Sequence, residues 1–189
     1  MSRSWDIIER LGALLRAEGR AAGKARGLQP VQIHALAYLA RCNRYSDTPT
    51  ALAEYLGVTK GTASQTVNVL ERGGWIAKHL DPDDGRQVRL ALTRSGRSLH
   101  RQLVPPPRMR EALRVGGDVE SALEEVLRRV QRARGGRTFG ICHTCRFFRR
   151  GRGGKRQCGL TGEPLTEADG DKICREHEEA SATAGHAQK

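Results

Sequence analysis

Apolar positions in the first part of the chain recur with the three-to-four-residue spacing of amphipathic helices. The pattern predicts one helix over residues 4–26 and a second over residues 30–43. Two shorter helices follow, and each has a start signal, Thr48 for the first and Thr59 for the second. Gly57 ends the first of these, so the sequence predicts a helix-turn-helix.

Beyond the two glycines that end the second short helix, the apolar spacing changes to two. Residues 75–79 alternate, and Val88, Leu90 and Leu92 share one face, as in half-buried β-strands. Between these strands lies the polar turn DPDDGR, residues 81–86. The pattern therefore predicts a mainly α-helical protein with a small β-wing, that is, a winged helix-turn-helix.

The second short helix presents a polar face opposite its apolar stripe of Ala63, Val67 and Leu70. Short and amide side chains on such a face can approach base edges and phosphates in a major groove. The candidate DNA-binding residues on this helix and its cap are Thr59, Lys60, Gly61, Thr62, Ser64, Gln65 and Asn68. Amphipathic helix pairs are also common in ordinary helical cores, so the prediction depends on the wing that follows.

Four segments, in this order, resemble the MarR family of winged-helix regulators. They are Leu28–Gln32, Leu70-Glu71, Asp81–Arg86 and Leu92–Gly96. The resemblance covers residues 4–104. It implies that Arg86 enters the minor groove and that Asp84 holds it in place. Gly85 stands where the family commonly has an arginine, so this wing has one cation fewer.

The resemblance also implies a homodimer in which the first helix shares the interface. A twofold dimer reaches two half-sites one helical turn apart, whereas a single recognition helix reads few base pairs. The family's long dimerisation helix would follow Gly96, but prolines at 105–107 must break it here. We expect a new helix, capped by Asp118, to complete the interface with the wide apolar face of residues 119–130.

The net charge of +12 favours a polyanionic partner, because each phosphate contact releases counterions. Of the 33 cations 27 are arginine, a bias that by itself leaves RNA or nonspecific binding open. The net charge is +9 over residues 1–136 and +3 over residues 137–189, so most of the positive charge lies with the winged helix. An aromatic content of 4% is low for RNA-binding modules, which stack bases on aromatic rings. We therefore expect a double-stranded DNA operator as the partner.

The N-terminal segment lacks a signal-peptide core, and no apolar run is long enough to span a bilayer. We expect a cytoplasmic protein with no membrane partner. The sequence shows no nucleophile motif, phosphate-binding loop or recognisable pair of catalytic carboxylates. We therefore expect it not to be an enzyme.

Four of the five cysteines lie within 33 residues near the C-terminus. They are Cys142, Cys145, Cys158 and Cys174. In a reducing compartment, clustered thiols are more typical of metal or redox chemistry than of disulfides. The sequence therefore predicts a small metal-binding tail with four cysteine ligands.

The metal stays open between Zn²⁺ and a four-iron four-sulfur cluster. Four thiolates around either carry the same net negative charge, which the cations of residues 146–156 would offset. Zinc ribbons usually have two close cysteine pairs, whereas here only the first pair is close. The spacing, Phe147-Phe148 and segment 158–165 resemble the small high-potential-type cluster domains that accompany some glycyl-radical enzymes, which favours the cluster. A zinc site could recruit His177 or His143 in place of a cysteine.

These patterns divide the chain into four parts. They are a winged-helix DNA-binding and dimerisation domain at 1–134, a linker at 135–141, a four-cysteine module at 142–178 and a disordered tail at 179–189. The main hypothesis is a transcriptional regulator, acting as a repressor, that binds DNA as a homodimer and responds to redox state or iron through the cluster. One alternative is a regulator with a structural zinc site and a small-molecule effector. Another is an iron-sulfur accessory or electron-transfer protein of an enzyme system.

Overall fold

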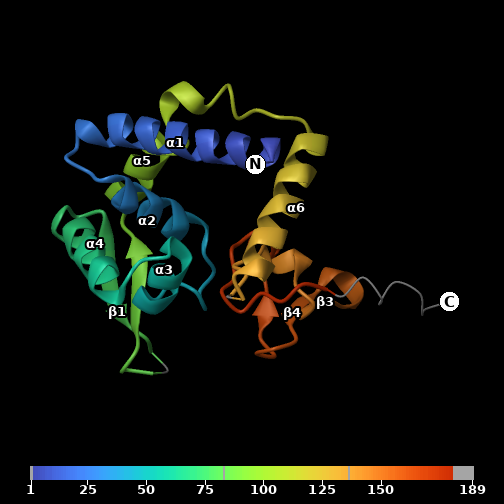
Figure 1. The fold of residues 1–189 in the computed structure, drawn as a ribbon. Helices are drawn as coiled ribbons and strands as arrows, with labels where there is room; N and C mark the ends of the chain where they lie inside the picture. The colour runs from blue at the N-terminus through green and yellow to red at the C-terminus, as the bar shows by residue number, and fades with distance from the viewer. Residues whose placement is uncertain (1, 83, 136, 181–189) are drawn as a thin grey trace.

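The computed structural model describes residues 2–82, 84–135 and 137–180 and shows a winged helix beside a small C-terminal module (Figure 1). The winged-helix part contains α1 (Arg3–Lys24), α2 (Pro30–Arg41), α3 (Pro49–Leu56), α4 (Lys60–Arg72), β1 (Ile76–Leu80), β2 (Val88–Leu92) and α5 (Arg94–Leu103). After it come η1 (Pro107–Met109), α6 (Gly117–Ala133), η2 (Cys142–Thr144), β3 (Phe148–Arg150), η3 (Arg152–Gly154), β4 (Arg156–Cys158), β5 (Pro164–Leu165) and α7 (Glu167–Gly170). The mainly helical fold with a small antiparallel wing is the one that the sequence predicts.

Local signals in the sequence account for the helix-turn-helix. The hydroxyl of Thr48 accepts a hydrogen bond from the N–H of Ala51 at 3.2 Å, and α3 ends at Gly57, whose φ of +65° is left-handed. The hydroxyl of Thr59 accepts from the N–H of Thr62 at 3.2 Å and so caps α4 in the same way. Both predicted caps and the glycine stop are confirmed.

The wing is an antiparallel pair in which Ile76 lies opposite Leu92 and Leu80 lies opposite Val88. Leu90 and Leu92 are buried, which confirms the predicted inner face of the second strand. A Cβ atom on Gly96 would lie 1.9 Å from the carbonyl oxygen of Trp75. Only glycine therefore lets the start of α5 pass this close to the start of the wing.

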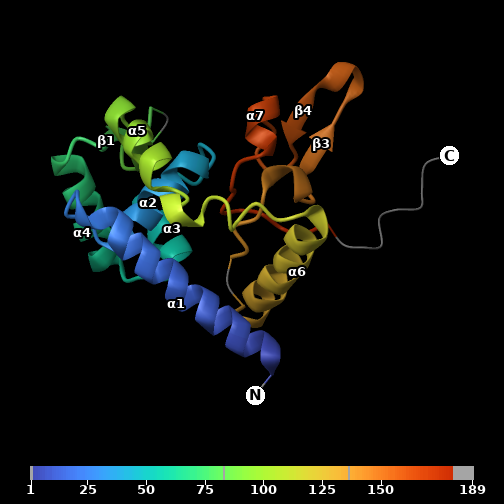
Figure 2. The ribbon, with the colours of Figure 1, turned by 90° about the horizontal axis from the view of Figure 1, so that it is seen from above.

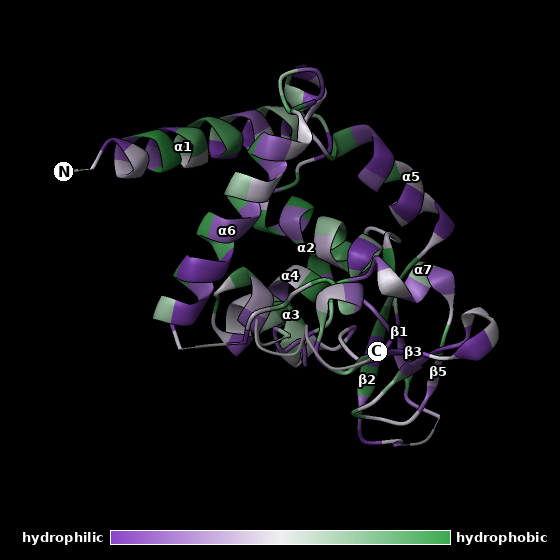
Figure 3. Ribbon diagram, turned by 90° about the vertical axis from the view of Figure 1, so that its right-hand side faces the viewer, coloured by the Kyte–Doolittle hydropathy of each residue, from purple (hydrophilic) through white to green (hydrophobic). Residues whose placement is uncertain are grey.

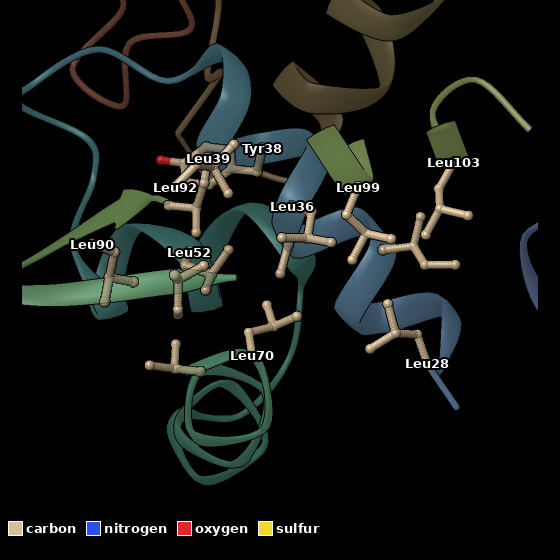
Figure 4. Close-up of a cluster of buried hydrophobic side chains, with 14 of the residues drawn as sticks. Leu28, Leu36, Tyr38, Leu39, Leu52, Leu70, Leu90, Leu92, Leu99 and Leu103 are labelled. Atoms are coloured by element: carbon tan, nitrogen blue, oxygen red, sulfur yellow. The ribbon is translucent and has the colours of Figure 1, made fainter. Parts of the chain in front are cut away.

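The core forms around α2, with side chains from α3, α4, the wing and α5 packed against it (Figure 4). Leu36, Leu52 and Leu70 are fully buried at the centre. Ile173, from the C-terminal module, joins the same cluster with 4% of its surface exposed. The two parts of the chain therefore share a core.

Beyond the wing, α5 stops at Leu103, immediately before the proline run, so the predicted break is confirmed. The expectation that Asp118 caps the next helix is wrong. Gly116 is the N-cap of α6, and Asp118 lies in the first turn, where a carboxylate interacts favourably with the helix dipole. None of the residues of α6 is buried, and the apolar side chains of both α6 and α1 are exposed. Figure 3 shows hydrophobic and hydrophilic residues alternating along both helices.

The C-terminal module is built on a three-stranded sheet with the order β3-β4-β5, followed by α7. Seen from above, the module lies beside the winged helix, with α6 next to it (Figure 2). Phe139, in the segment expected to be a linker, packs edge-on against the rings of Tyr38 and Tyr55. Most of the tail expected at 179–189 lies outside the described residues, which end at Ala180.

Among the helices of the described residues, none combines the length and apolarity needed to cross a membrane.

Candidate DNA interface and cysteine module

The polar face of α4 is exposed as the sequence predicts. All seven candidate residues on the helix and its cap lie at the surface, namely Thr59, Lys60, Gly61, Thr62, Ser64, Gln65 and Asn68. Ala63, Val67 and Leu70 are buried on the opposite side and hold the helix against the core. The helix can therefore offer its polar face to a partner while its packing stays intact.

One of these residues has a second contact that the sequence did not indicate. The carboxamide oxygen of Asn68 accepts a hydrogen bond from the Lys78 ammonium at 2.9 Å, and the same ammonium lies 2.7 Å from the carboxylate of Glu71. Lys78 belongs to β1, so this contact ties α4 to the first strand of the wing. Asn68 therefore positions the wing as well as facing outward.

A partly buried ion-pair cluster fixes the base of the wing. The guanidinium of Arg89 contacts Oδ2 of Asp81 at 2.5 Å and Oδ1 of Asp47 at 2.9 Å, and it donates to the carbonyl oxygen of Arg44 at 2.8 Å. Asp81 is almost fully buried, and Asp47 and Arg44 come from the loop between α2 and α3. The strand alternation places Arg89 on the outer face but gives no sign of these partners, which lie 8, 42 and 45 residues away in sequence.

At the wing tip, Oδ1 of Asp84 accepts a hydrogen bond from the backbone N–H of Arg86 at 3.1 Å. The N–H of Asp84 donates in turn to Oδ1 of Asp81 at 3.1 Å. These bonds shape the turn and carry the exposed Arg86 side chain at its end. Asp84 thus contacts Arg86 through the backbone.

The helix-turn-helix and the first strand of the wing lie within residues 26–87, and these residues match the model of the MarR family. This segment is therefore similar to a MarR winged helix. The transcriptional repressor MprA of Escherichia coli strain K12 is 31% identical to this chain over 83 residues. That stretch is 44% of this chain and 47% of MprA, so the chain spans about half the length of the curated relatives it matches.

Solved structures share the fold. S. aureus MepR in its DNA-binding conformation is 20% identical with a TM-score of 0.61, over 70% of this chain and 98% of MepR. Sco3205 of Streptomyces coelicolor, a MarR family regulator solved in complex with DNA, is 26% identical with a TM-score of 0.55, over 69% of this chain and 84% of Sco3205.

The C-terminal module brings the first three cysteines together through a turn and a strand pair. Cys142 and Cys145 flank a single 3-10 turn, in which the N–H of Cys145 donates to the carbonyl of Cys142 at 3.0 Å. The N–H of Phe148 donates to the carbonyl of Cys145 at 2.9 Å, and Phe148 pairs with Cys158 across β3 and β4. Cys158 therefore lies beside the turn that holds the close pair.

The fourth cysteine arrives on a segment that runs alongside the first. The N–H of Cys142 donates to the carbonyl of Lys172 at 3.0 Å, and the N–H of Cys174 donates to the carbonyl of Gly140 at 2.9 Å. This backbone ladder places Cys174 next to Cys142. All five cysteines of the chain are free thiols.

Electrostatics agree with this proximity. Burial raises the pKa of the Cys142 thiol to about 12, and the charges of Cys174, Cys145 and Cys158 raise it further. Within the described residues, however, no group of three or more His, Cys, Asp or Glu side chains converges on a position for a metal ion. The four thiols thus lie in one region of the module but do not converge on a common point in the structure described.

Nitrogen donors face two of these sulfurs. The N–H of Glu178 lies 3.5 Å from Sγ of Cys145. Burial raises the pKa of Cys174, and hydrogen bonds from the Asn43 side chain and the Glu176 backbone oppose that rise. Donors to sulfur favour the thiolate, which is the form that binds metals.

Both candidate histidines have other partners. The ring nitrogens of His177 lie 2.8 Å from the hydroxyl of Thr138 and 2.9 Å from the hydroxyl of Thr144. His177 is buried, and this burial lowers its pKa. Nδ1 of His143 lies 2.9 Å from the carbonyl oxygen of Gly170. The cysteines are therefore the better candidates for metal ligands.

The segment that carries Cys174 also binds the winged helix. The N–H of Ile173 donates to the carbonyl of Arg41 at 2.9 Å, and the carbonyl of Ile173 accepts a hydrogen bond from the N–H of Asn43 at 2.9 Å. The N–H of Arg175 donates to the hydroxyl of Ser46 at 2.8 Å. In the sequence, the only sign of this docking is a single isoleucine before the last cysteine.

A cavity of about 1160 Å³ lies where α3, α6 and the C-terminal module meet. Its lining includes the aromatic rings of Tyr55 and Phe139, apolar Leu127 and the guanidinium groups of Arg128 and Arg137. The rings and Leu127 suit a flat molecule. Arg128 pairs with Glu124 and Glu125, and Arg137 pairs with Glu54 and Glu176, so an anionic group on that molecule would have to compete with these carboxylates.

Proposed function

We propose that the protein is a sequence-specific DNA-binding transcriptional regulator that acts as a repressor. The observation that carries this proposal is the exposed polar face of α4 beside a wing whose base is fixed by Arg89. A fixed wing lets the helix and Arg86 approach adjacent grooves with one geometry. The MarR match over residues 26–87 supports the same reading.

Selection of binding sites from a randomised duplex library tests this function. We expect enrichment of a two-half-site sequence and tight binding to it at fixed salt. Arg86→Ala should weaken binding to that site, whereas Arg108→Ala, which changes an exposed arginine in η1, should leave it unchanged. Failure to enrich any sequence would refute the proposed function.

The regulator acts as a homodimer through α1 and α6. Both helices expose apolar side chains along one stripe, and on α6 these are Val119, Leu123, Val126, Leu127 and Val130. Apolar stripes of this length are typical of association surfaces. Analytical ultracentrifugation should show that the parent protein is a dimer. The double variant Leu123→Glu with Leu127→Glu should be a monomer, and the control variant Glu120→Gln, changed at an exposed polar position, should remain a dimer.

The four cysteines form a metal centre, with a four-iron four-sulfur cluster as the favoured occupant and Zn²⁺ as the alternative. The turn at Cys142–Cys145, the Phe148–Cys158 pair and the ladder to Cys174 support this assignment. Bound metal would replace the mutual repulsion of the thiolates with attraction to a cation. Anaerobic purification with iron, sulfide and zinc measured on one sample decides between the two occupants.

Metal loading would control DNA binding through the docked segment. Ile173 lies in the core beside α2, and Arg175 contacts both Ser46 and α3, so a change at Cys174 reaches the support of the recognition helix. We expect the loaded protein to bind the selected operator more tightly than the metal-free protein. Equal affinities at the same salt concentration would rule out redox or iron control.

A small-molecule effector is a second candidate signal, and the cavity beside Phe139 favours it. Flat aromatic carboxylates should weaken operator binding when they occupy this cavity. Arg137→Gln should reduce that effect. Because Arg137 also pairs with Glu54 and Glu176, the effect is measured in each variant as the ratio of operator affinities with and without the compound.

A further inference from the structure

The twelve residues between Cys145 and Cys158 form a strongly basic hairpin. Strands β3 and β4 pair Phe148 with Cys158 and Arg150 with Arg156, and a glycine-rich turn connects them. The cations of this stretch are Arg146, Arg149, Arg150, Arg152, Lys155 and Arg156. No acidic residue occurs from Arg146 to Gly162. The hairpin is therefore a local concentration of positive charge.

Most of this charge is directed to the surface and has no counter-charge. Arg149, Arg150, Arg152 and Lys155 are exposed. Within the described residues, none of these four forms an ion pair, whereas Arg146 pairs with Glu178 and Arg156 with Glu167. Clustered cations without partners repel one another, and a polyanion would relieve that repulsion.

Arg44 contacts both the wing and the strand next to the hairpin, and so links the two. Arg89 of the wing donates to the carbonyl of Arg44, and the side chain of Arg44 lies 2.8 Å from Glu163 and donates to the carbonyl of Pro164 at 3.1 Å. Pro164 belongs to β5, which pairs with β4 of the hairpin. Figures 1 and 3 show the wing and the β3–β4 hairpin at the same end of the molecule, away from α1.

We propose that the β3–β4 hairpin is a second DNA contact that binds phosphates outside the bases read by α4. The inference rests on the proposed DNA-binding function and adds a binding surface to it. The wing and the hairpin would contact one duplex together, since both lie at one end and are joined by Arg44. Cys145 and Cys158 close the base of the hairpin, so a centre formed there would also hold the second contact in shape.

The test measures how operator affinity of the full chain depends on salt concentration. The hairpin variant is Arg150→Gln with Arg152→Gln. The control is Arg108→Gln with Arg114→Gln, which removes the same charge around η1, a segment that packs against α1. The hairpin variant should lower the slope of log affinity against log salt by about two to four for a dimer, and it should weaken binding at 150 mM salt by about tenfold or more. The control should match the parent, and preference between operator sequences should not change in either variant.

A parent-like slope and footprint in the hairpin variant would overturn the proposal. Loss of bound metal in that variant would also overturn it, because the arginines would then serve to balance the thiolates. Stronger binding of the parent to single-stranded RNA than to duplex DNA of equal charge would assign the hairpin to another partner and reject the proposal. If the parent binds no duplex at all, the proposed DNA-binding function fails first.

Discussion

Arg175 donates to both carboxylate oxygens of Glu54, with 2.7 Å from Nε to Oε2 and 2.6 Å from Nη2 to Oε1. The two residues are 121 positions apart, and their contact joins the segment that carries Cys174 to α3 of the helix-turn-helix. Two parallel hydrogen bonds give this pair a defined geometry. The hydrogen bond from Arg175 lowers the pKa of Glu54.

This pair should stabilise the protein modestly and only above acidic pH. Glu54 is 38% exposed, so solvent screening limits the coupling to about 0.5–1 kcal/mol. Because the pKa of Glu54 is lower in the folded state, the contribution is present above the unfolded pKa and is lost as the pH falls through the folded one. A double-mutant cycle with Arg175→Met and Glu54→Gln should therefore give a coupling in urea denaturation at neutral pH that declines as the pH falls below the unfolded pKa of Glu54 and disappears below the folded one. The same coupling at neutral and at acidic pH would contradict the assignment.

Two glycines should respond in opposite ways to an added methyl group. Gly96→Ala should cost about 2 kcal/mol or more, because its Cβ would overlap the Trp75 carbonyl. Gly61→Ala meets only the Thr59 hydroxyl at 3.8 Å and should leave stability unchanged or raise it by about 0.5 kcal/mol. Thermal denaturation measures both. If Gly61→Ala weakens operator binding without loss of stability, close approach of DNA to the start of α4 explains the loss.

The elements with local signals were predictable, and the contacts between distant residues were not. Thr48, Thr59 and Gly57 set the helix-turn-helix through bonds to their near neighbours, and the alternation at 88–92 shows which side of the strand is buried. The partners of Arg89 lie 8 and 42 residues away, and no periodic pattern records them. For α6, the first-turn carboxylate resembles a cap, and only the backbone geometry shows that the cap is Gly116.

Removal of the Arg89 side chain should loosen the wing. Arg89→Ala takes two hydrogen-bonded contacts from Asp81 and Asp47, and Asp81 is nearly buried, so we expect a loss of about 2 kcal/mol in the free energy of unfolding. Arg86→Ala, at the exposed tip, should change stability by less than about 0.5 kcal/mol. Both variants should bind operator less tightly. Equal stability of the two variants would mean that the ion-pair cluster does not fix the wing.

Substitution of Cys174 should reduce the metal content of the protein, whereas substitution of Cys42 should not. Cys174→Ser should lower bound metal per chain well below that of the parent, because it removes one of the four proposed ligands. Cys42 serves as the matched control. It is also a free thiol, it lies at the end of α2, and its backbone forms a β-bridge with Ile173, the residue before Cys174. Burial raises the pKa of Cys42 to about 12, so it behaves as a small apolar group, and Cys42→Ala should retain the metal. Loss of metal from both variants, with folding preserved, would point to a general effect of cavity formation beside Ile173.

Gln65 and Asn68 should differ in what they contribute to operator recognition. Gln65 faces outward from α4, so Gln65→Ala should lose discrimination at particular base pairs by about 1–3 kcal/mol and leave the wing unchanged. Asn68 also holds Lys78, so Asn68→Ala should weaken binding to all operators through the wing. Lys78→Met removes the other partner of the Asn68–Lys78 hydrogen bond. It should weaken binding to all operators by a similar amount, without changing the preference between them. Binding to a set of operators with single base changes measures these effects. If Lys78→Met leaves binding unaffected while Asn68→Ala alters preference at one base pair, Asn68 acts on the DNA directly.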